Sequence, residues 1–190
     1  QVSGYMVPHA FQLSPVGLLR VPASWGWGTW RRAWDFYNDN TLSLIDKLSK
    51  LEISNFDLDG TYDYFNSLVA NAQGDADTWA VRWYASSYLK NMMTIYPRLS
   101  FTRNIGHSYG GTNCGASKMS QVFHHQKIAQ SFCGLENIEL HLNEESPEYL
   151  EALKGFYRLQ KQIWSTPSLK KRIINRLKRE FAALAGDVHD

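Results

Sequence analysis

The chain carries apolar residues at helical spacing in several separate stretches. Residues 41–51, 62–69 and 77–93 each place apolar side chains three or four positions apart, which puts them on one face of a helix. Two further helices are predicted toward the C-terminus, over 147–164 and from Ser168 onward, each introduced by a capping serine. The pattern therefore predicts a helix-rich protein.

Strand-like stretches are few and short. Residues 2–7 and 17–22 are apolar and close at a proline, residues 100–104 have strand composition, and residues 138–142 alternate apolar and polar side chains. Strands and helices do not alternate regularly, which excludes a complete doubly wound sheet. We expect a helix-rich α/β fold with a few short strands and a helical C-terminal tail.

The composition is that of a globular domain. The 190 residues are 44% hydrophobic and 14% aromatic, which is enough apolar material for a core. With 20 basic and 18 acidic residues the net charge is +2, so no overall attraction to nucleic acid is expected. Cys114 and Cys133 lack the spacing of a zinc motif, and no stretch approaches the ~18 apolar residues of a membrane span.

Two features bear on the setting of the chain. It begins at Gln1, and residues 2–8 read like the middle of a fold, so we expect a piece of a longer protein. The last predicted helix is rich in lysine and arginine, which favours either a solvated end or weak contact with anionic lipid. Two cysteines fit a reducing compartment, and we expect a cytoplasmic protein that touches the inner face of a membrane at most peripherally.

Four tryptophans fall within eleven residues, and the first two alternate with glycine as Trp25-Gly26-Trp27-Gly28. Indole faces stack on the C–H faces of sugar rings, and glycine lets the backbone approach a ligand closely. These four residues are therefore candidates for binding a saccharide. Aromatic packing at the start of a helix is the alternative.

The next two tryptophans, Trp30 and Trp34, are four residues apart. They would share one face of a helix running from residue 28 or 29 to residue 37. We expect both indoles to lie in the core and to anchor this helix.

Two carboxylates, Asp75 and Asp77, precede the helix predicted over 77–93. At a helix N-terminus one of them can cap while the other projects and serves as a general base. Asp75 is also a candidate substrate-binding residue, and plain capping is the alternative. A second Asp-x-Asp pair, Asp57 and Asp59, precedes a glycine and is interpreted as a turn.

A glycine-rich loop covers residues 104–115. Its glycines, hydroxyls and backbone donors could surround a diphosphate or a divalent ion, although it matches neither a Walker motif nor a dinucleotide fingerprint. A plain surface loop is the alternative. The candidate ligand-binding residues in this loop are Asn104, His107, Gly110, Gly111 and Thr112, and His107 is the candidate metal ligand.

Three stretches in this order resemble a known family: residues 24–34, residues 77–83, and residues 96–100 followed by 104–107 and 111–114. They resemble the nucleotide-diphospho-sugar glycosyltransferases with a GT-A fold, which act in bacterial surface-polysaccharide synthesis. A more distant resemblance is to the Golgi enzyme that adds N-acetylglucosamine to mannose. The resemblance covers about residues 1–135, so we expect this part to be one unit and residues 136–190 to form a strand and C-terminal helices outside it.

The resemblance implies transfer of a sugar from a nucleotide-sugar donor to the hydroxyl of a saccharide acceptor. In the family an Asp-x-Asp motif that holds a divalent cation, Mn²⁺ or Mg²⁺, lies N-terminal to the matched region. The chain would thus be the acceptor-side half, with a partial GT-A-like fold, and would need a missing donor-binding half as its partner. Alone it would be inactive or weakly active.

The resemblance also implies roles for individual residues. Asp77 would deprotonate the acceptor, Trp25 and Trp27 would line the sugar pocket, and residues 104–114 would lie near the diphosphate. Relatives often have histidine where this chain has Asn113, and His107 is the candidate to take the place of that histidine. In-line attack would invert the anomeric centre.

Two other functions remain open on the sequence. One is a non-catalytic carbohydrate-binding or assembly module that keeps the same scaffold. The other is a helical interaction domain whose tryptophans form the core.

Overall fold

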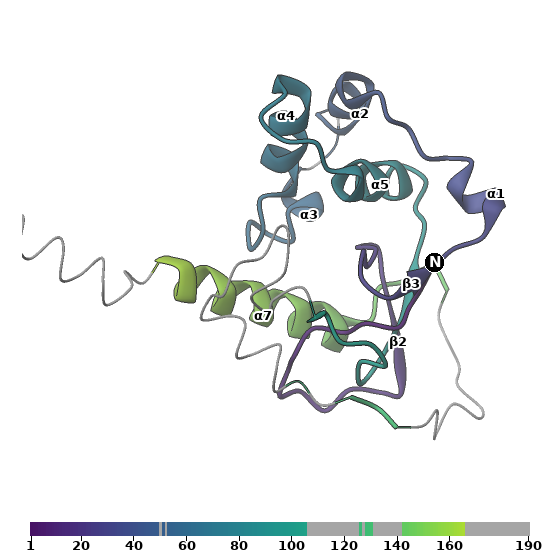
Figure 1. Ribbon diagram of the computed structural model, residues 1–190, viewed down its shortest axis with the longest axis vertical. Coiled ribbons are helices and arrows are strands. Elements are labelled where there is room, and N and C mark those ends of the chain that lie inside the picture. Colours follow the sequence, from purple (N-terminus) through teal and green to yellow (C-terminus); the bar gives the residue numbers. More distant parts are fainter. Residues whose placement is uncertain (50, 52, 106–125, 127, 131–141, 166–190) are drawn as a thin grey trace, which may run out of the picture. The chain divides into compact units, whose positions relative to one another are not determined.

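The computed structural model describes residues 1–49, 51, 53–105, 126, 128–130 and 142–165 (Figure 1). The chain divides into a compact unit, Gln1–Arg158, and a C-terminal unit, Leu159–Asp190. Within the described residues the first unit combines helices with one small mixed sheet, as an α/β fold does. The strand expected over 138–142 and the helix expected from Ser168 lie outside the described residues, apart from Leu142, which lies in a turn.

The sheet has the strand order β2-β4-β1-β3. Strand β4 pairs parallel with β1 and antiparallel with β2, and β1 pairs antiparallel with β3. The bounds are Val2–Ser3 for β1, Val16–Leu19 for β2, Trp27–Gly28 for β3 and Thr94–Pro97 for β4. The strand expected over 100–104 is wrong, because the chain pairs earlier, at β4, and from Phe101 its backbone N–H reaches the Gly4 carbonyl instead, at 2.7 Å.

The helices largely follow the apolar stripes. Their bounds are Arg31–Trp34 for α1, Thr41–Leu48 for α2, Ile53–Phe56 for α3, Tyr64–Gln73 for α4, Trp79–Tyr88 for α5 and Pro147–Ser165 for α7. The predicted helices over 41–51, 62–69, 77–93 and 147–164 thus correspond to α2, α4, α5 and α7. Helix α5 ends earlier than expected, and Asn91 just beyond it has a φ of 51°.

Helices α2 to α5 lie together beside the sheet (Figure 1). Their interior is aromatic: the Phe56 ring stacks on Tyr84 with centroids 4.3 Å apart, and the hydroxyls of Tyr64 and Tyr157 lie 2.7 Å apart. Burial raises the pKa of Tyr64, Tyr84 and Tyr157, so these phenols stay neutral at neutral pH.

The second Asp-x-Asp pair forms a turn, as expected. Leu58, Asp59 and Gly60 all have positive φ, of 53°, 54° and 72°. The carboxylate of Asp57 accepts the Phe65 backbone N–H at 2.8 Å. These local bonds occupy Asp57 in the entry to α4.

The start of α7 packs on the sheet. Ser146 donates its backbone N–H to the Leu18 carbonyl at 2.8 Å, and the Tyr149 hydroxyl donates to the Ser14 carbonyl at 2.8 Å. The compact unit Gln1–Arg158 therefore includes the first part of α7.

Candidate functional site

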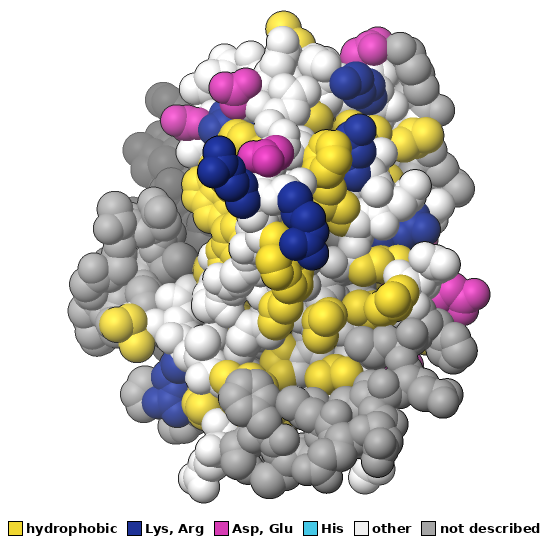
Figure 2. All heavy atoms as spheres, turned by 90° about the vertical axis from the view of Figure 1, so that its right-hand side faces the viewer, with side chains coloured by type: hydrophobic (Ala, Val, Ile, Leu, Met, Phe, Trp, Pro, Cys, Tyr) yellow, Lys and Arg dark blue, Asp and Glu magenta, His cyan; other side chains and the backbone are white. Residues whose placement is uncertain are grey.

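An open hollow of about 490 Å³ lies where β3, α1 and α5 meet. Figure 2 shows the side of the molecule on which α1 lies in Figure 1, where apolar side chains gather with lysine and arginine among them. The residues that line the hollow are Trp27, Gly28, Thr29, Trp34, Tyr37 and Trp79. They come from three segments of the chain that are separate in the sequence.

Trp27 is the centre of the aromatic wall. Its ring stacks on Trp79 with centroids 5.6 Å apart and on Trp83 with centroids 6.3 Å apart. Trp83 is only 2% exposed and forms the fixed base behind Trp27. Trp34 contacts Trp27 with ring centroids 6.0 Å apart, and the Trp34 and Tyr37 rings are parallel within 2°, with centroids 4.9 Å apart. Because the rings hold one another, the wall is preorganised.

Two further lining residues fit a ligand site. An added Cβ on Gly28 would meet nothing within 4 Å, so the backbone there is open to a ligand. The Thr29 Oγ1 is buried and finds no hydrogen-bond partner in the described part of the chain. A buried hydroxyl of this kind is costly until water or a ligand bonds to it.

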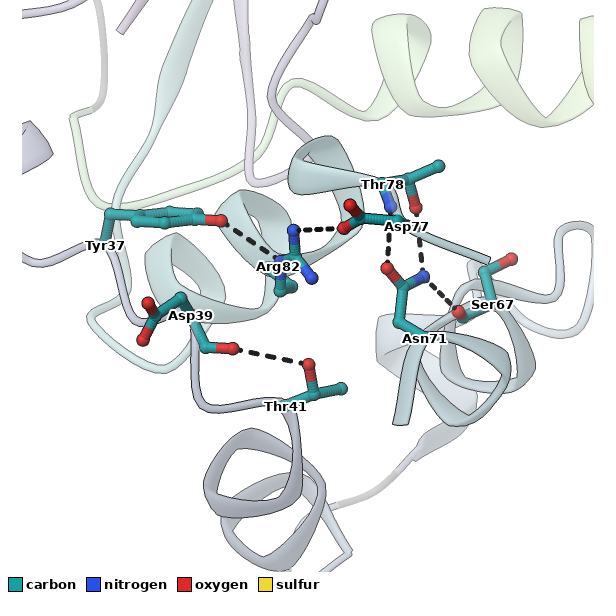
Figure 3. A network of polar contacts seen from close by, with 8 residues as sticks. All are labelled: Tyr37, Asp39, Thr41, Ser67, Asn71, Asp77, Thr78 and Arg82. Carbon is teal, nitrogen blue, oxygen red and sulfur yellow. Dashed lines mark hydrogen bonds and ion pairs between the residues drawn. The ribbon is translucent and has the colours of Figure 1, made fainter. Parts of the chain in front are cut away.

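Asp77 does not line the hollow; it lies two residues before the lining residue Trp79 and is held by Arg82 (Figure 3). The Arg82 Nη2 donates to Asp77 Oδ1 at 2.8 Å, and its Nε donates to the Tyr37 hydroxyl at 3.1 Å. The Tyr37 hydrogen bond and the Asp77 carboxylate raise the pKa of Arg82, so the guanidinium stays charged. The carboxylate itself is 88% exposed and open to solvent and ligands.

The segment that carries Asp77 is fixed by Asn71 of α4 (Figure 3). Its side-chain amide donates to the Ser67 carbonyl at 2.8 Å and to Thr78 Oγ1 at 3.0 Å, and its oxygen accepts the Thr78 backbone N–H at 2.7 Å. Thr78 is the N-cap residue of α5. Asn71 thus binds the N-cap residue, and the hydrogen bond that Asp77 accepts comes from Arg82 and not from the backbone of α5.

Asp75 does not join Asp77 at the site. Its backbone N–H bonds to the Ala70 carbonyl at 3.0 Å, just after Gly74, which ends α4 with a φ of 81°. Asp75 therefore belongs to the end of α4, and only Asp77 reaches Arg82.

Trp25 and Gly26 are not among the residues that line the hollow. Trp25 packs edge-on against Tyr5 with centroids 5.0 Å apart. Gly26 has a φ of 52°, and an added Cβ would lie 2.3 Å from Thr102 Oγ1. The structure thus uses Gly26 for a turn and for close packing on Thr102. Of the expected saccharide-binding group, Trp27 and Gly28 line the hollow.

The expectation that Trp30 and Trp34 lie in the core is wrong. Their exposures are 45% and 37%. Helix α1 has four residues and buries none of them, because a single turn offers too little surface for a core-facing stripe. Trp34 turns toward the hollow instead, and Trp30 lies beneath the Arg32 guanidinium at 5.2 Å.

Sequence reasoning missed Tyr37, Trp79 and Arg82 as site residues. The available signal was weak: Trp79 and Arg82 are three apart on a predicted helix, which places them on neighbouring faces. Nothing local connects Tyr37 to α5, since that contact spans 45 residues.

Most of the glycine-rich loop lies outside the residues that the structure describes. Of the candidates in this loop, Asn104 lies in the described segment, which ends at Ile105. The others, His107, Gly110, Gly111 and Thr112, lie outside the described residues. In the part that is described, no three His, Cys, Asp or Glu side chains come together as a metal site. None of the helices described there is both long and apolar enough to cross a bilayer.

Comparison with known proteins adds no relative. No family model matches the chain, and neither a curated protein nor a solved structure matches it. The case for a function therefore depends on the residues of the hollow and on the sequence resemblance.

Proposed function

We propose that the chain is the acceptor-side part of a glycosyltransferase, in which the aromatic hollow binds a saccharide and Asp77 accepts the proton of its attacking hydroxyl. The observation that carries the proposal is the meeting of Trp27, Trp34 and Trp79 in one open hollow, in which a fourth lining residue, Tyr37, is joined through Arg82 to the Asp77 carboxylate.

The hollow suits a sugar ring. Its volume of about 490 Å³ lies within the usual range of small-ligand sites, roughly 300–1,000 Å³. Indole faces offer stacking to C–H groups, while hydroxyls need partners that lie at the rim. The Tyr37 hydroxyl, the Arg82 guanidinium and the Asp77 carboxylate form a polar row that begins at the hollow, because Tyr37 lines it (Figure 3).

The chemistry assigned to this chain is one proton transfer. As the acceptor oxygen bonds to the anomeric carbon of the donor, the bond from that carbon to the nucleotide diphosphate breaks with its electron pair on the diphosphate. Asp77 takes the proton from the acceptor oxygen. As the resemblance implies, an Mn²⁺ or Mg²⁺ ion would be held mostly by the donor-binding half, and the candidate ligand His107 of this chain lies outside the described residues.

The decisive experiment compares two isosteric variants in the longer chain that includes the donor-binding half. Asp77→Asn should lower kcat for transfer by about 10²–10⁴-fold, the usual contribution of a general base, while acceptor binding persists. Asp75→Asn is the matched control, since Asp75 lies two residues away and ends α4. Full kcat in Asp77→Asn would reject the assignment.

A non-catalytic carbohydrate-binding module is the second candidate, because the hollow alone accounts for saccharide binding. Quenching of tryptophan fluorescence by methyl α-mannopyranoside tests for binding, and Trp27→Ala should abolish it. Trp30→Ala is the control, since Trp30 is exposed but does not line the hollow. Binding without transfer in the longer chain would favour the module. The third idea, a domain with all its tryptophans in the core, conflicts with the exposure of Trp30, Trp34 and Trp79.

A further inference from the structure

Arg82 connects the wall of the hollow to the Asp77 carboxylate (Figure 3). Its Nε binds the hydroxyl of Tyr37, which lines the hollow, and its Nη2 binds Asp77, which does not. The arginine side chain is only 18% exposed, whereas the aspartate side chain is 88% exposed. A largely covered cation thus holds a carboxylate that otherwise projects into solvent.

Both ends of this bridge are fixed by further contacts. The Tyr37 ring lies parallel to Trp34, and the next backbone N–H, of Asn38, donates to Ser86 Oγ of α5 at 3.0 Å. Arg82 and Ser86 are one turn apart on α5, so they anchor the same stretch of chain twice. At the other end Thr78, next to Asp77, is clamped by Asn71.

We propose that Arg82 is a positioning residue that couples occupancy of the aromatic hollow to the orientation of the Asp77 carboxylate. The inference rests on the proposed binding of a saccharide in the hollow. A ring stacked on Trp34 and Tyr37 sets the position of the Tyr37 hydroxyl, and the planar guanidinium transmits that position to Asp77. Lysine cannot replace it, because an ammonium lacks the fork that binds in two fixed directions.

Nuclear magnetic resonance of the full chain tests the coupling without any turnover. We would titrate methyl α-mannopyranoside and follow the tryptophan indole N–H signals together with the Arg82 Nε–H signal. The Arg82 signal should shift with the same midpoint as the indole signals, although Arg82 does not line the hollow. In Tyr37→Phe the indole shifts should persist, because the stacked ring remains, and the Arg82 shift should be lost.

The outcomes separate the two proposals. Indole signals that saturate while the Arg82 signal stays still would overturn the coupling and leave saccharide binding intact. An Arg82 shift of equal size in Tyr37→Phe would also overturn it. Indole signals that do not respond would instead reject the saccharide site, and the coupling with it.

Kinetics of the longer chain give a second readout. Arg82→Lys should lower kcat by about tenfold to a hundredfold, the scale of a misplaced catalytic group, with the acceptor KM within twofold of wild type. Arg158→Lys is the matched control, since Arg158 pairs with Glu151 at 3.5 Å in α7. A merely structural Arg82 would lower the melting temperature and raise KM while sparing kcat, and that result would refute the positioning role.

Discussion

Replacing Gly17 by alanine tests how α7 packs on the sheet. Gly17 lies in β2 opposite the Tyr149 ring, and an added Cβ would fall 2.2, 2.4 and 2.6 Å from the ring atoms Cδ2, Cε2 and Cγ. Tyr149 is fully buried and donates its hydroxyl to the Ser14 carbonyl. The ring would have to withdraw by about 1 Å to restore ordinary contact, and neither its burial nor its hydrogen bond allows that freely.

The expected loss of stability follows from these contacts. Overfilling a packed core costs about 1–3 kcal/mol, and weakening the Tyr149 hydrogen bond adds about 1 kcal/mol. Gly17→Ala should therefore lower the free energy of unfolding by about 2–4 kcal/mol, a large part of the ~5–15 kcal/mol typical of a domain. At ~2–4 °C per kcal/mol for a chain of this size, the melting temperature should fall by about 4–16 °C.

Urea denaturation and thermal unfolding measure the change. Gly28→Ala is the control, because its added Cβ would meet nothing within 4 Å and alanine there changes mainly the entropy of the unfolded chain. Gly17→Ala with Tyr149→Leu should recover part of the loss, since the smaller side chain makes room. If Gly17→Ala matched Gly28→Ala within about 0.5 kcal/mol, the packing of Tyr149 on β2 would be refuted.

Three further predictions concern polar contacts. Asn71→Ala removes three hydrogen bonds, two of them to Thr78 at the entry to α5, and should cost about 1–3 kcal/mol. Amide hydrogen exchange in the first turn of α5 should become faster, and unchanged exchange would contradict the prediction. Lys154 donates to Asp59 at 2.6 Å, which raises the pKa of the lysine above its ordinary 10.5. The ion pair should therefore contribute its full stabilisation of the fold below pH 10.5, and this contribution should be lost as the pH rises through the folded-state pKa of Lys154. Urea denaturation at several pH values should show the loss in wild type and not in Lys154→Met. Burial raises the pKa of Asp57 above 3.8, so the wild-type protein should lose stability as the pH rises through 3.8 and the folded-state pKa of Asp57. The free energy of unfolding of Asp57→Asn should therefore increase relative to that of wild type between about pH 3 and pH 7. A difference between the two proteins that stays constant with pH would count against this prediction.

The local parts of the fold were predictable because local spacing determines them. The apolar stripes of α2, α4 and α5 predict helices, because residues three and four apart lie on one helix face regardless of which segment packs against it. The turn that contains Asp59 and Gly60 follows from residue types that tolerate positive φ. Strands β3 and β4 were missed, because strands of two and four residues are defined by partners far away in the sequence.

In the candidate site, too, residues recognisable from their local sequence were predicted, and residues placed by distant contacts were missed. Trp27 was identified from its own neighbours, and Asp77 from its place before a helix. Tyr37 and Arg82 were not predicted as site residues, because their hydrogen bond joins two residues that are 45 positions apart in the sequence.

The sequence by itself determined which segments coil, where they turn, and that an unusual number of indoles would be available. Only the tertiary structure decided which of those indoles share a hollow. It left Trp34 partly exposed and set Trp79 against Trp27, because a four-residue helix cannot bury its own face and the surface that receives a side chain is built by distant segments. The sequence therefore identifies which aromatic residues are clustered along the chain, but the packing of β3, α1 and α5 determines which rings contact one another.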